Sequence, residues 1–313
     1  MLKKNKKQYT INVNNKLRME AAMKISVKAA AKINLLLDLT AILENGYHSI
    51  FTVMQSVGIY DVVTVETTDT GKIELSCTDN TMPLNNKNTA WKAAERFLEY
   101  INDTATGVKI HIEKNIPSQA GMAGGSADAA AVIKALDYLL NTNLSEEVLC
   151  AIGTKVGADV PFCISGGTKL CMNIGEVMAS LPSLPECHIL VSKPNQGVST
   201  QEAYTNYDSA EWIRHPDNEG FVFAATQKDL DKMCKKAANV FEQVVEIADR
   251  VKIKAIMRNN NAKLAMMTGS GAAVFSIFEN EKDAKVCYKE LKEKYSETFL
   301  TKPVEKSIEF ITE

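Results

Sequence analysis

The chain has 313 residues, of which 45% are hydrophobic and 24% charged, and its formal net charge is −2. These values are ordinary for a globular protein, and they exclude a nucleic-acid binder that acts through bulk positive charge. The length favours two lobes, because one hydrophobic core seldom serves so many residues.

The seven cysteines include no C-x-x-C pair, and the four histidines show no H-x-x-x-H spacing. This usage indicates reduced thiols in a cytoplasmic protein, and no metal-binding set of side chains is predicted. No apolar run is long enough for a signal peptide or a membrane span. Residues 1–23 are polar and basic, and we expect them to form a disordered extension.

The first ordered pattern is a series of strands. Residues 24–39 alternate from Lys32 onward, so Lys32 and Asn34 share one face of a strand. An Asn-Gly turn follows, and β-branched residues then predict three more strands, over 51–57, 61–67 and 72–77. A helix is predicted over 89–100, capped by Asn88 or Thr89, and a strand over 107–113.

A loop of small residues, Q-A-G-M-A-G-G-S at 119–126, then leads into an Ala-rich helix over 127–140. Glycine lets the backbone approach a ligand, and the first helical turn offers unpaired amide groups and the positive end of the dipole. Together these features suit a phosphate group. The glycine spacing matches neither a P-loop nor the dinucleotide fingerprint. The alternative is a turn that only lets the helix pack closely.

The rest of the chain alternates between helices and strands. A helix begins at Ser145, a turn and a short strand follow at 165–172, and a proline-rich segment at 181–185 is the best boundary. Beyond it we expect helices from Ser199 and within 228–248 and 281–294, and strands that flank the turn 269–271. This pattern predicts an α+β fold with two lobes, 24–180 and 186–313.

Five blocks of this sequence occur in an order and spacing that resemble the GHMP kinase superfamily. They are A-K-I-N-L at 31–35, G-Y-H at 46–48, the segment 116–130, G-A-D-V-P at 157–161 and T-G-S-G at 268–271. The resemblance extends from about residue 24 to residue 278. It implies a first lobe like domain 2 of ribosomal protein S5, a ferredoxin-like second lobe, and a cleft between them for ATP and substrate.

The resemblance implies ATP and Mg²⁺ as cofactors. The loop residues that would wrap the ATP phosphates are Pro117, Ser118, Gln119, Ala120, Gly121, Met122, Ala123, Gly124, Gly125, Ser126 and Ala127. Ser126 would bind a β-phosphate oxygen or Mg²⁺, or serve as a helix N-cap. Asn88 matches a residue that contacts adenine, with a plain N-cap as the alternative.

Two charged residues match the catalytic positions of the superfamily. Asp159 would accept or orient the proton of the substrate hydroxyl, and Lys32 would stabilise charge on the transferring phosphoryl group. Taken singly, Asp159 could be a turn or cap carboxylate, and Lys32 could be a solvated strand lysine. Their occurrence within two matching blocks favours the catalytic interpretation.

The A-K-I-N, G-Y-H and G-A-D-V-P blocks point to the branch that phosphorylates the 2-hydroxyl of a cytidine-diphospho sugar alcohol in the non-mevalonate isoprenoid pathway. Asn34 would bind the sugar alcohol, Tyr47 would stack on cytosine and His48 would read its edge. Thr200 and Tyr204 would close over the cytidine. The alternatives are an exposed loop histidine for His48 and a packing aromatic for Tyr204.

The loop departs from the usual pattern at Gln119, Met122 and Ala127, where a second serine is common. Other acceptors, such as mevalonate, homoserine or a sugar, therefore stay open, as does a catalytically silent nucleotide-binding paralogue. The expected partner is a small-molecule substrate, with no nucleic acid and no membrane, and the sequence allows a weak homodimer.

Overall fold

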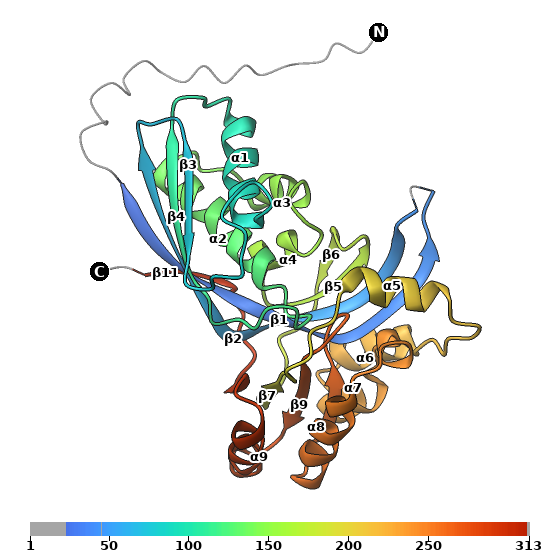
Figure 1. Ribbon diagram of the computed structural model, residues 1–313. Helices are drawn as coiled ribbons and strands as arrows, with labels where there is room; N and C mark the ends of the chain where they lie inside the picture. The colour runs from blue at the N-terminus through green and yellow to red at the C-terminus, as the bar shows by residue number, and fades with distance from the viewer. Residues whose placement is uncertain (1–22, 45, 312–313) are drawn as a thin grey trace.

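The computed structural model describes residues 23–44 and 46–311 (Figure 1). The predicted N-terminal extension, residues 1–23, lies outside the described residues except for Met23. The larger of two sheets has seven strands in the order β11-β1-β2-β4-β3, with β5 paired to β2 and β6 to β5. These strands are β1 (Lys24–Ile42), β2 (His48–Thr68), β3 (Ile73–Cys77), β4 (Gly107–Glu113), β5 (Thr168–Asn173), β6 (Val177–Ser180) and β11 (Ile308–Ile311).

Four helices gather on one side of this sheet (Figure 1). They are α1 (Thr89–Ile101), α2 (Gly124–Leu139), α3 (Glu146–Thr154) and α4 (Val160–Ser165). The Ala-rich α2 contacts β1, β2 and α1, and its alanines are almost completely buried. Because alanine is small and favours helix, α2 can lie close to the strands and hold its N-terminal end firmly against them.

The second sheet has four antiparallel strands in the order β10-β7-β9-β8, and helices pack around it. The strands are β7 (His188–Ser192), β8 (Leu264–Met267), β9 (Val274–Phe278) and β10 (Thr298–Thr301). The helices of this half are α5 (Thr200–Asp208), α6 (Asn218–Thr226), α7 (Leu230–Lys236), the 3₁₀ helix η2 (Val240–Gln243), α8 (Ala248–Asn259) and α9 (Glu281–Lys294). The α+β fold with two sheets confirms the predicted class.

The last strand departs from the predicted division of the chain into 24–180 and 186–313. β11 pairs with β1 in the larger sheet, so residues 308–311 return to the first lobe. The segment that leads from β10 back to β11 passes beside Gly58 of β2, whose amide donates to the carbonyl of Lys302. A Cβ atom at Gly58 would lie 2.9 Å from Thr301 Oγ1, so a glycine here makes room for the crossing.

The two strands expected at 51–57 and 61–67 are a single strand, β2, and that part of the prediction was wrong. Gly58 does not end the strand, because the register shift between Ala30 and Ala31 accommodates the extra residues as a bulge. All seven cysteines are free thiols, as expected. Within the described ranges, no helix is long and apolar enough to cross a membrane.

Candidate active site

A cavity of about 770 Å³ lies between the Gly-rich loop, β1 and the loops of the second sheet. This volume is typical of small-molecule sites. Its lining includes most of the predicted site residues: Lys32, Asn34, the loop residues 117–125, Asp159, Thr200 and Tyr204. Among the described residues, the lining does not include Asn88, Ser126, Ala127, Tyr47 or His48.

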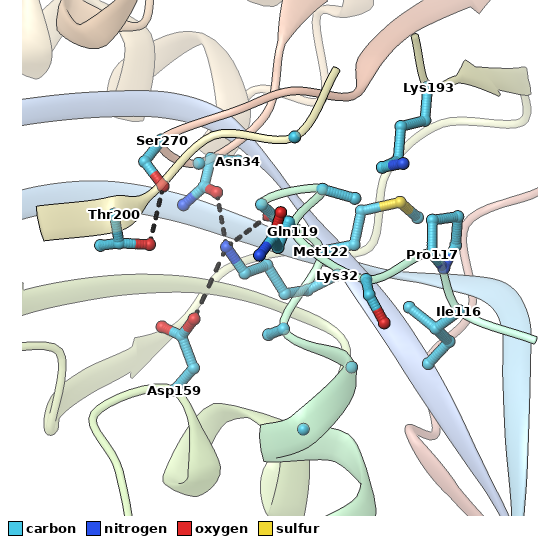
Figure 2. Close-up of a pocket in the computed structure, with 18 of the residues that line it drawn as sticks. Lys32, Asn34, Ile116, Pro117, Gln119, Met122, Asp159, Lys193, Thr200 and Ser270 are labelled. Atoms are coloured by element: carbon cyan, nitrogen blue, oxygen red, sulfur yellow. Dashed lines mark hydrogen bonds and ion pairs between the residues drawn. The ribbon is translucent and has the colours of Figure 1, made fainter. Parts of the chain in front are cut away.

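Lys32 lies at the centre of the cavity wall (Figure 2). Its ammonium donates to Asn34 Oδ1 at 2.8 Å and to the carbonyl of Gly121 at 2.9 Å, and Asp159 Oδ2 lies 3.6 Å away. The residue is only 4% exposed, so the alternative of a solvated strand lysine was wrong. Two hydrogen bonds and an ion pair compensate for the burial of this charge and hold it in one place.

Asp159 precedes α4 and occupies its N-cap position, but its side chain makes no capping hydrogen bond. The helix begins with Val160 and Pro161, and proline suits this first turn because its missing amide hydrogen is not needed there. The carboxylate is partly exposed and faces Lys32 (Figure 2). It is therefore available to a ligand in the cavity.

Asn34 is buried beside Lys32, and its amide is already engaged within the protein. Its Oδ1 accepts from Lys32, and its Nδ2 donates to Thr52 Oγ1 at 2.8 Å. The hydroxyl of Thr268, in the T-G-S-G turn, also donates to Asn34 Oδ1 at 3.3 Å. These contacts orient Lys32, whereas the predicted contact of Asn34 with a sugar alcohol stays a prediction.

The Gly-rich loop packs directly on the T-G-S-G turn. Gly121 has φ +71°, and a Cβ atom there would lie 2.1 Å from the carbonyl oxygen of Thr268. The amide of Ala272 donates to the carbonyl of Gln119, and that of Ala273 donates to the carbonyl of Ala120. The second lobe thus fixes the loop through its backbone, and only glycine can occupy position 121 without displacing the turn.

Helix α2 begins at Gly124, three residues earlier than predicted, and its N-cap is Ala123 in the left-handed conformation. The interpretation of Ser126 as an N-cap was therefore wrong, because Ser126 lies within the first turn. Ala123 provides no side-chain cap, so the first amides of α2 have no side-chain acceptor from this position. Gly124 and Gly125 line the cavity, which places this helix end at its wall.

Asn88 caps α1. Its Oδ1 accepts from the amide of Ala90 at 2.9 Å, and its Nδ2 donates to the carbonyl of Pro83 at 2.9 Å. The N-cap alternative is thereby confirmed, and the predicted contact with adenine stays a prediction. Thr89 donates its hydroxyl to the carbonyl of Gly125 at 2.6 Å, so the start of α1 also supports the Gly-rich loop.

His48 is the first residue of β2, and its side chain is 9% exposed, so the alternative of an exposed loop histidine was wrong. Its Nε2 lies 2.7 Å from Asp208 Oδ1, and its ring centroid lies 5.0 Å from that of Tyr204. The neighbouring Tyr47 is 65% exposed. His48 is therefore not a lining residue itself, but it contacts the lining residue Tyr204.

Tyr204 and Thr200 bring α5 to the cavity. The Tyr204 ring packs edge-on against Phe241, and Thr200 Oγ1 lies 3.0 Å from Ser270 Oγ. Burial, with the negative charge of Asp159 adding to it, raises the pKa of Tyr204 to about 12. The hydroxyl of Tyr204 is therefore protonated at neutral pH and able to donate a hydrogen bond.

A buried ionic cluster behind the loop was not foreseen. Lys114 pairs with both Asp61 and Asp128, and the amides of Asn115 and Ile116 donate to Asp61 Oδ1. Burial, and secondarily the nearby charge of Asp61, raises the pKa of Asp128 to about 8, although Lys114 opposes this. The signal was present in the sequence, since Asp128 interrupts a run of alanines on an apolar helix.

Among the described residues, no group of histidine, cysteine and acidic side chains could hold a metal ion. Asp159 is the one carboxylate among the described residues that line the cavity. Mg²⁺ commonly uses one or two carboxylates together with substrate phosphates. The donor set thus fits Mg²⁺ that arrives on a polyphosphate.

Two family profiles match the chain: GHMP kinases N terminal domain, over residues 88–167, and GHMP kinases C terminal, over residues 222–297. A 4-diphosphocytidyl-2-C-methyl-D-erythritol kinase of Caldicellulosiruptor bescii is 44% identical over 285 residues, or 90% of this chain and 99% of that protein. The protein of the same name from Clostridium tetani is 40% identical over 283 residues, or 90% and 100%.

Solved structures of GHMP-type kinases are also similar to this chain. A 4-(cytidine 5'-diphospho)-2C-methyl-D-erythritol kinase superposes with a TM-score of 0.72 at 27% identity, covering 90% of this chain and 99% of that chain. A homoserine kinase from Cytophaga hutchinsonii, with a TM-score of 0.75 at 18% identity, covers 92% and 97% and has the same fold.

Proposed function

Because the chain belongs to the GHMP kinase superfamily, and within it to the 4-diphosphocytidyl-2-C-methyl-D-erythritol kinases, we propose that it transfers the γ-phosphoryl group of ATP to the 2-hydroxyl of 4-diphosphocytidyl-2-C-methyl-D-erythritol. The observation that carries the mechanism is the pairing of Lys32 with Asp159, 3.6 Å apart, on the wall of a cavity that also contains the start of α2.

The phosphates of ATP would lie against the Gly-rich loop. The first amides of α2, at Gly124 and Gly125, and the dipole of the helix favour negative charge at this point. Lys32 adds a full positive charge beside the loop, since it is bonded to the carbonyl of Gly121. We assign residues 117–127 to the phosphates, with the Ser126 hydroxyl in the first turn, and Asn88 to the adenine side.

The transfer itself needs little covalent chemistry from the protein. The oxygen of the substrate 2-hydroxyl attacks the γ-phosphorus, and the bond from that phosphorus to the β–γ bridging oxygen breaks. The hydroxyl proton passes to the Asp159 carboxylate, while Lys32 stabilises the charge on the transferring group. Asp159, the one carboxylate among the described lining residues, would help to hold Mg²⁺ that arrives with the phosphates, and the ion would supply further neutralisation of their charge.

The cytidine end of the substrate would lie on the α5 side of the cavity. Tyr204 presents a protonated hydroxyl and an aromatic ring there, and His48 packs behind that ring. Asp208 Oδ1 accepts a hydrogen bond from Nε2 of His48, which would hold the imidazole at a fixed angle for reading a cytosine edge. Tyr47 would stack on the base, and Asn34 would reach the sugar alcohol through the amide hydrogen that does not bond to Thr52.

A weak homodimer and a cytoplasmic location remain part of the proposal.

The test is ADP release with Mg-ATP and a panel of alcohols that includes 4-diphosphocytidyl-2-C-methyl-D-erythritol, mevalonate and homoserine. Turnover with the cytidine compound alone is the expected outcome. Turnover with another alcohol would retain the Lys32–Asp159 chemistry and remove the cytosine site. Binding of ATP without turnover of any alcohol would contradict the proposed activity.

A further inference from the structure

Three lysines line the cavity, and they differ in how fully their charges are paired. Lys32 has Asn34, the Gly121 carbonyl and Asp159 as partners. Lys114 is held between two buried carboxylates. The third, Lys193, has one partner for its ammonium among the described residues, Glu297 Oε2 at 2.6 Å.

It is unusual for the ammonium of Lys193 to have so few partners, because the residue is only 9% exposed. An ammonium has three donor hydrogens, and a charge at this depth is costly unless it is well paired. Its carboxylate partner has a side chain that is 41% exposed, so water already competes for Glu297. The ammonium thus has donors left over on the side that faces the cavity.

The position of Lys193 indicates what it would bind. It follows β7, and its amide donates to the carbonyl of Glu297, so the base of the side chain is fixed. Figure 2 shows the side chain directed from the second lobe toward Met122 and Pro117 of the Gly-rich loop. Thr200 and Asp159 lie toward the other end of the view. Lys193 therefore faces the end of the cavity assigned to ATP.

We infer that Lys193 is an ATP-binding residue, which turns from Glu297 toward the phosphate groups of the nucleotide and clamps them against the Gly-rich loop from the second lobe. The inference rests on the proposed function, since it needs ATP in this cavity. Phosphate oxygens are the expected partners because they carry full charge and accept several hydrogen bonds from one ammonium. No bond is made or broken in this step.

The test compares Lys193→Met with Glu297→Gln in the full-length protein. Binding of a non-hydrolysable ATP analogue is measured by calorimetry, and binding of adenosine by competition. Because a charge-assisted hydrogen bond is lost, Lys193→Met should weaken binding of the analogue by about tenfold or more and leave the affinity for adenosine unchanged. Glu297→Gln keeps the ammonium and removes its competitor, so the analogue should bind as well as to the wild type or more tightly.

Three results would overturn the inference. Equal affinity of the wild type and Lys193→Met for the analogue would show that the ammonium does not reach the phosphates. An equal loss for adenosine would show a distorted site, and a matching loss in both variants with lower melting temperatures would show a structural ion pair only. If the wild type does not bind the analogue at all, the proposed function itself fails. The three results above overturn the inference alone, because in each of them the wild type still binds the analogue.

Discussion

Lys32 carries a full charge at a position where less than a tenth of the residue reaches solvent, and its surroundings are built to hold that charge. Asn34, two residues along the same face of β1, accepts one of its hydrogens, and Gly121 accepts another. Asp159 lies slightly farther away, at a distance that leaves its oxygens available to a ligand. At the scale of single residues, Lys32 is thus fixed by two hydrogen bonds, whereas the partly exposed carboxylate of Asp159 is held only by the longer ion pair with Lys32 among the described residues.

Asp159→Asn tests the role of this partly exposed carboxylate. An amide of the same shape cannot accept the hydroxyl proton, so kcat should fall by roughly 10²–10⁴. The KM for ATP should change little, because the phosphates are assigned to the loop and Lys32. Steady-state kinetics measure both quantities, and an unchanged melting temperature serves as the folding control. A variant that keeps full kcat would contradict the assignment.

His48→Ala tests the cytidine end. Removal of the imidazole takes away a hydrogen-bonding edge and the ring that supports Tyr204. A lost hydrogen bond of about 1–3 kcal/mol should raise the KM for the cytidine substrate between about five- and a hundredfold, with the KM for ATP unchanged. His111→Ala, on β4 and outside the cavity lining among the described residues, is the matched control. Equal KM values in both variants would remove His48 from the site.

At the scale of elements, the Gly-rich loop connects the two halves of the molecule, because it follows β4 of the larger sheet and packs on the T-G-S-G turn between β8 and β9 of the second sheet. Its glycines and the left-handed Ala123 turn the chain sharply from β4 into α2. Asp61 anchors the beginning of the loop through the amides of Asn115 and Ile116, and the T-G-S-G turn supports its middle. The phosphate site proposed for this loop would need rigid amides, because its donors are backbone groups that cannot adjust individually.

Gly121→Ala should disrupt the contact between the Gly-rich loop and the T-G-S-G turn. Its Cβ would lie 2.1 Å from the Thr268 carbonyl oxygen, so the loop or the turn must move. Gly46→Ala is the matched control, since Gly46 also has positive φ (+81°) but a Cβ there would meet nothing within 4 Å. We expect Gly121→Ala to lose about 1–3 kcal/mol more unfolding free energy than Gly46→Ala, measured in urea, together with most of its kinase activity. Equal losses would show that backbone conformation alone matters.

Seen as a whole molecule, the two halves share structure and are not independent. The largest hydrophobic core cluster includes Ile33 of β1 and Phe275 of β9, and β11 returns to pair with β1. Buried Asp38 of β1 bonds to His215 and Asn218 from the second half. The cavity can therefore combine residues from both halves in a fixed relation, which a kinase that positions two substrates requires.

The stability of the whole molecule should depend on pH through Asp128. Its folded-state pKa is raised to about 8, above its ordinary value near 3.8, so the folded protein holds a proton that the unfolded chain releases. The stabilisation of the folded state by this proton is complete below the pKa that Asp128 has in the unfolded chain. It is lost as the pH rises through the folded-state pKa of about 8. Urea unfolding at pH 6 to 9 should therefore show stability falling more in the wild type than in Asp128→Asn, which cannot titrate. Parallel curves for the two proteins would contradict the raised pKa.

Much of the fold could be predicted from patterns of local sequence. Alternation along β1 placed Lys32 and Asn34 on one face, and the boundaries of α1, β4 and α9 follow from periodicity and capping residues. The predictions failed where distant contacts decide. Gly58 does not end β2, because a bulge in its pairing with β1 accommodates it and the returning C-terminal segment bonds to its amide. Helix α2 begins earlier than predicted, where Thr89 at the start of α1 bonds to the carbonyl of Gly125.

By itself, the sequence determined the α+β class, the Gly-rich loop, the Lys32–Asp159 pair and the family, because these depend on residue types at short, fixed spacings. Only the tertiary structure decided how other side chains are used: Asn34 as a support for Lys32, His48 as a packed ring, and Lys193 as a buried charge whose ammonium has one partner among the described residues. The contacts of Asn34 with Thr268, of His48 with Tyr204 and of Lys193 with Glu297 each join residues more than a hundred positions apart. They also depend on burial, which sets the energy of a charge and which no local pattern encodes.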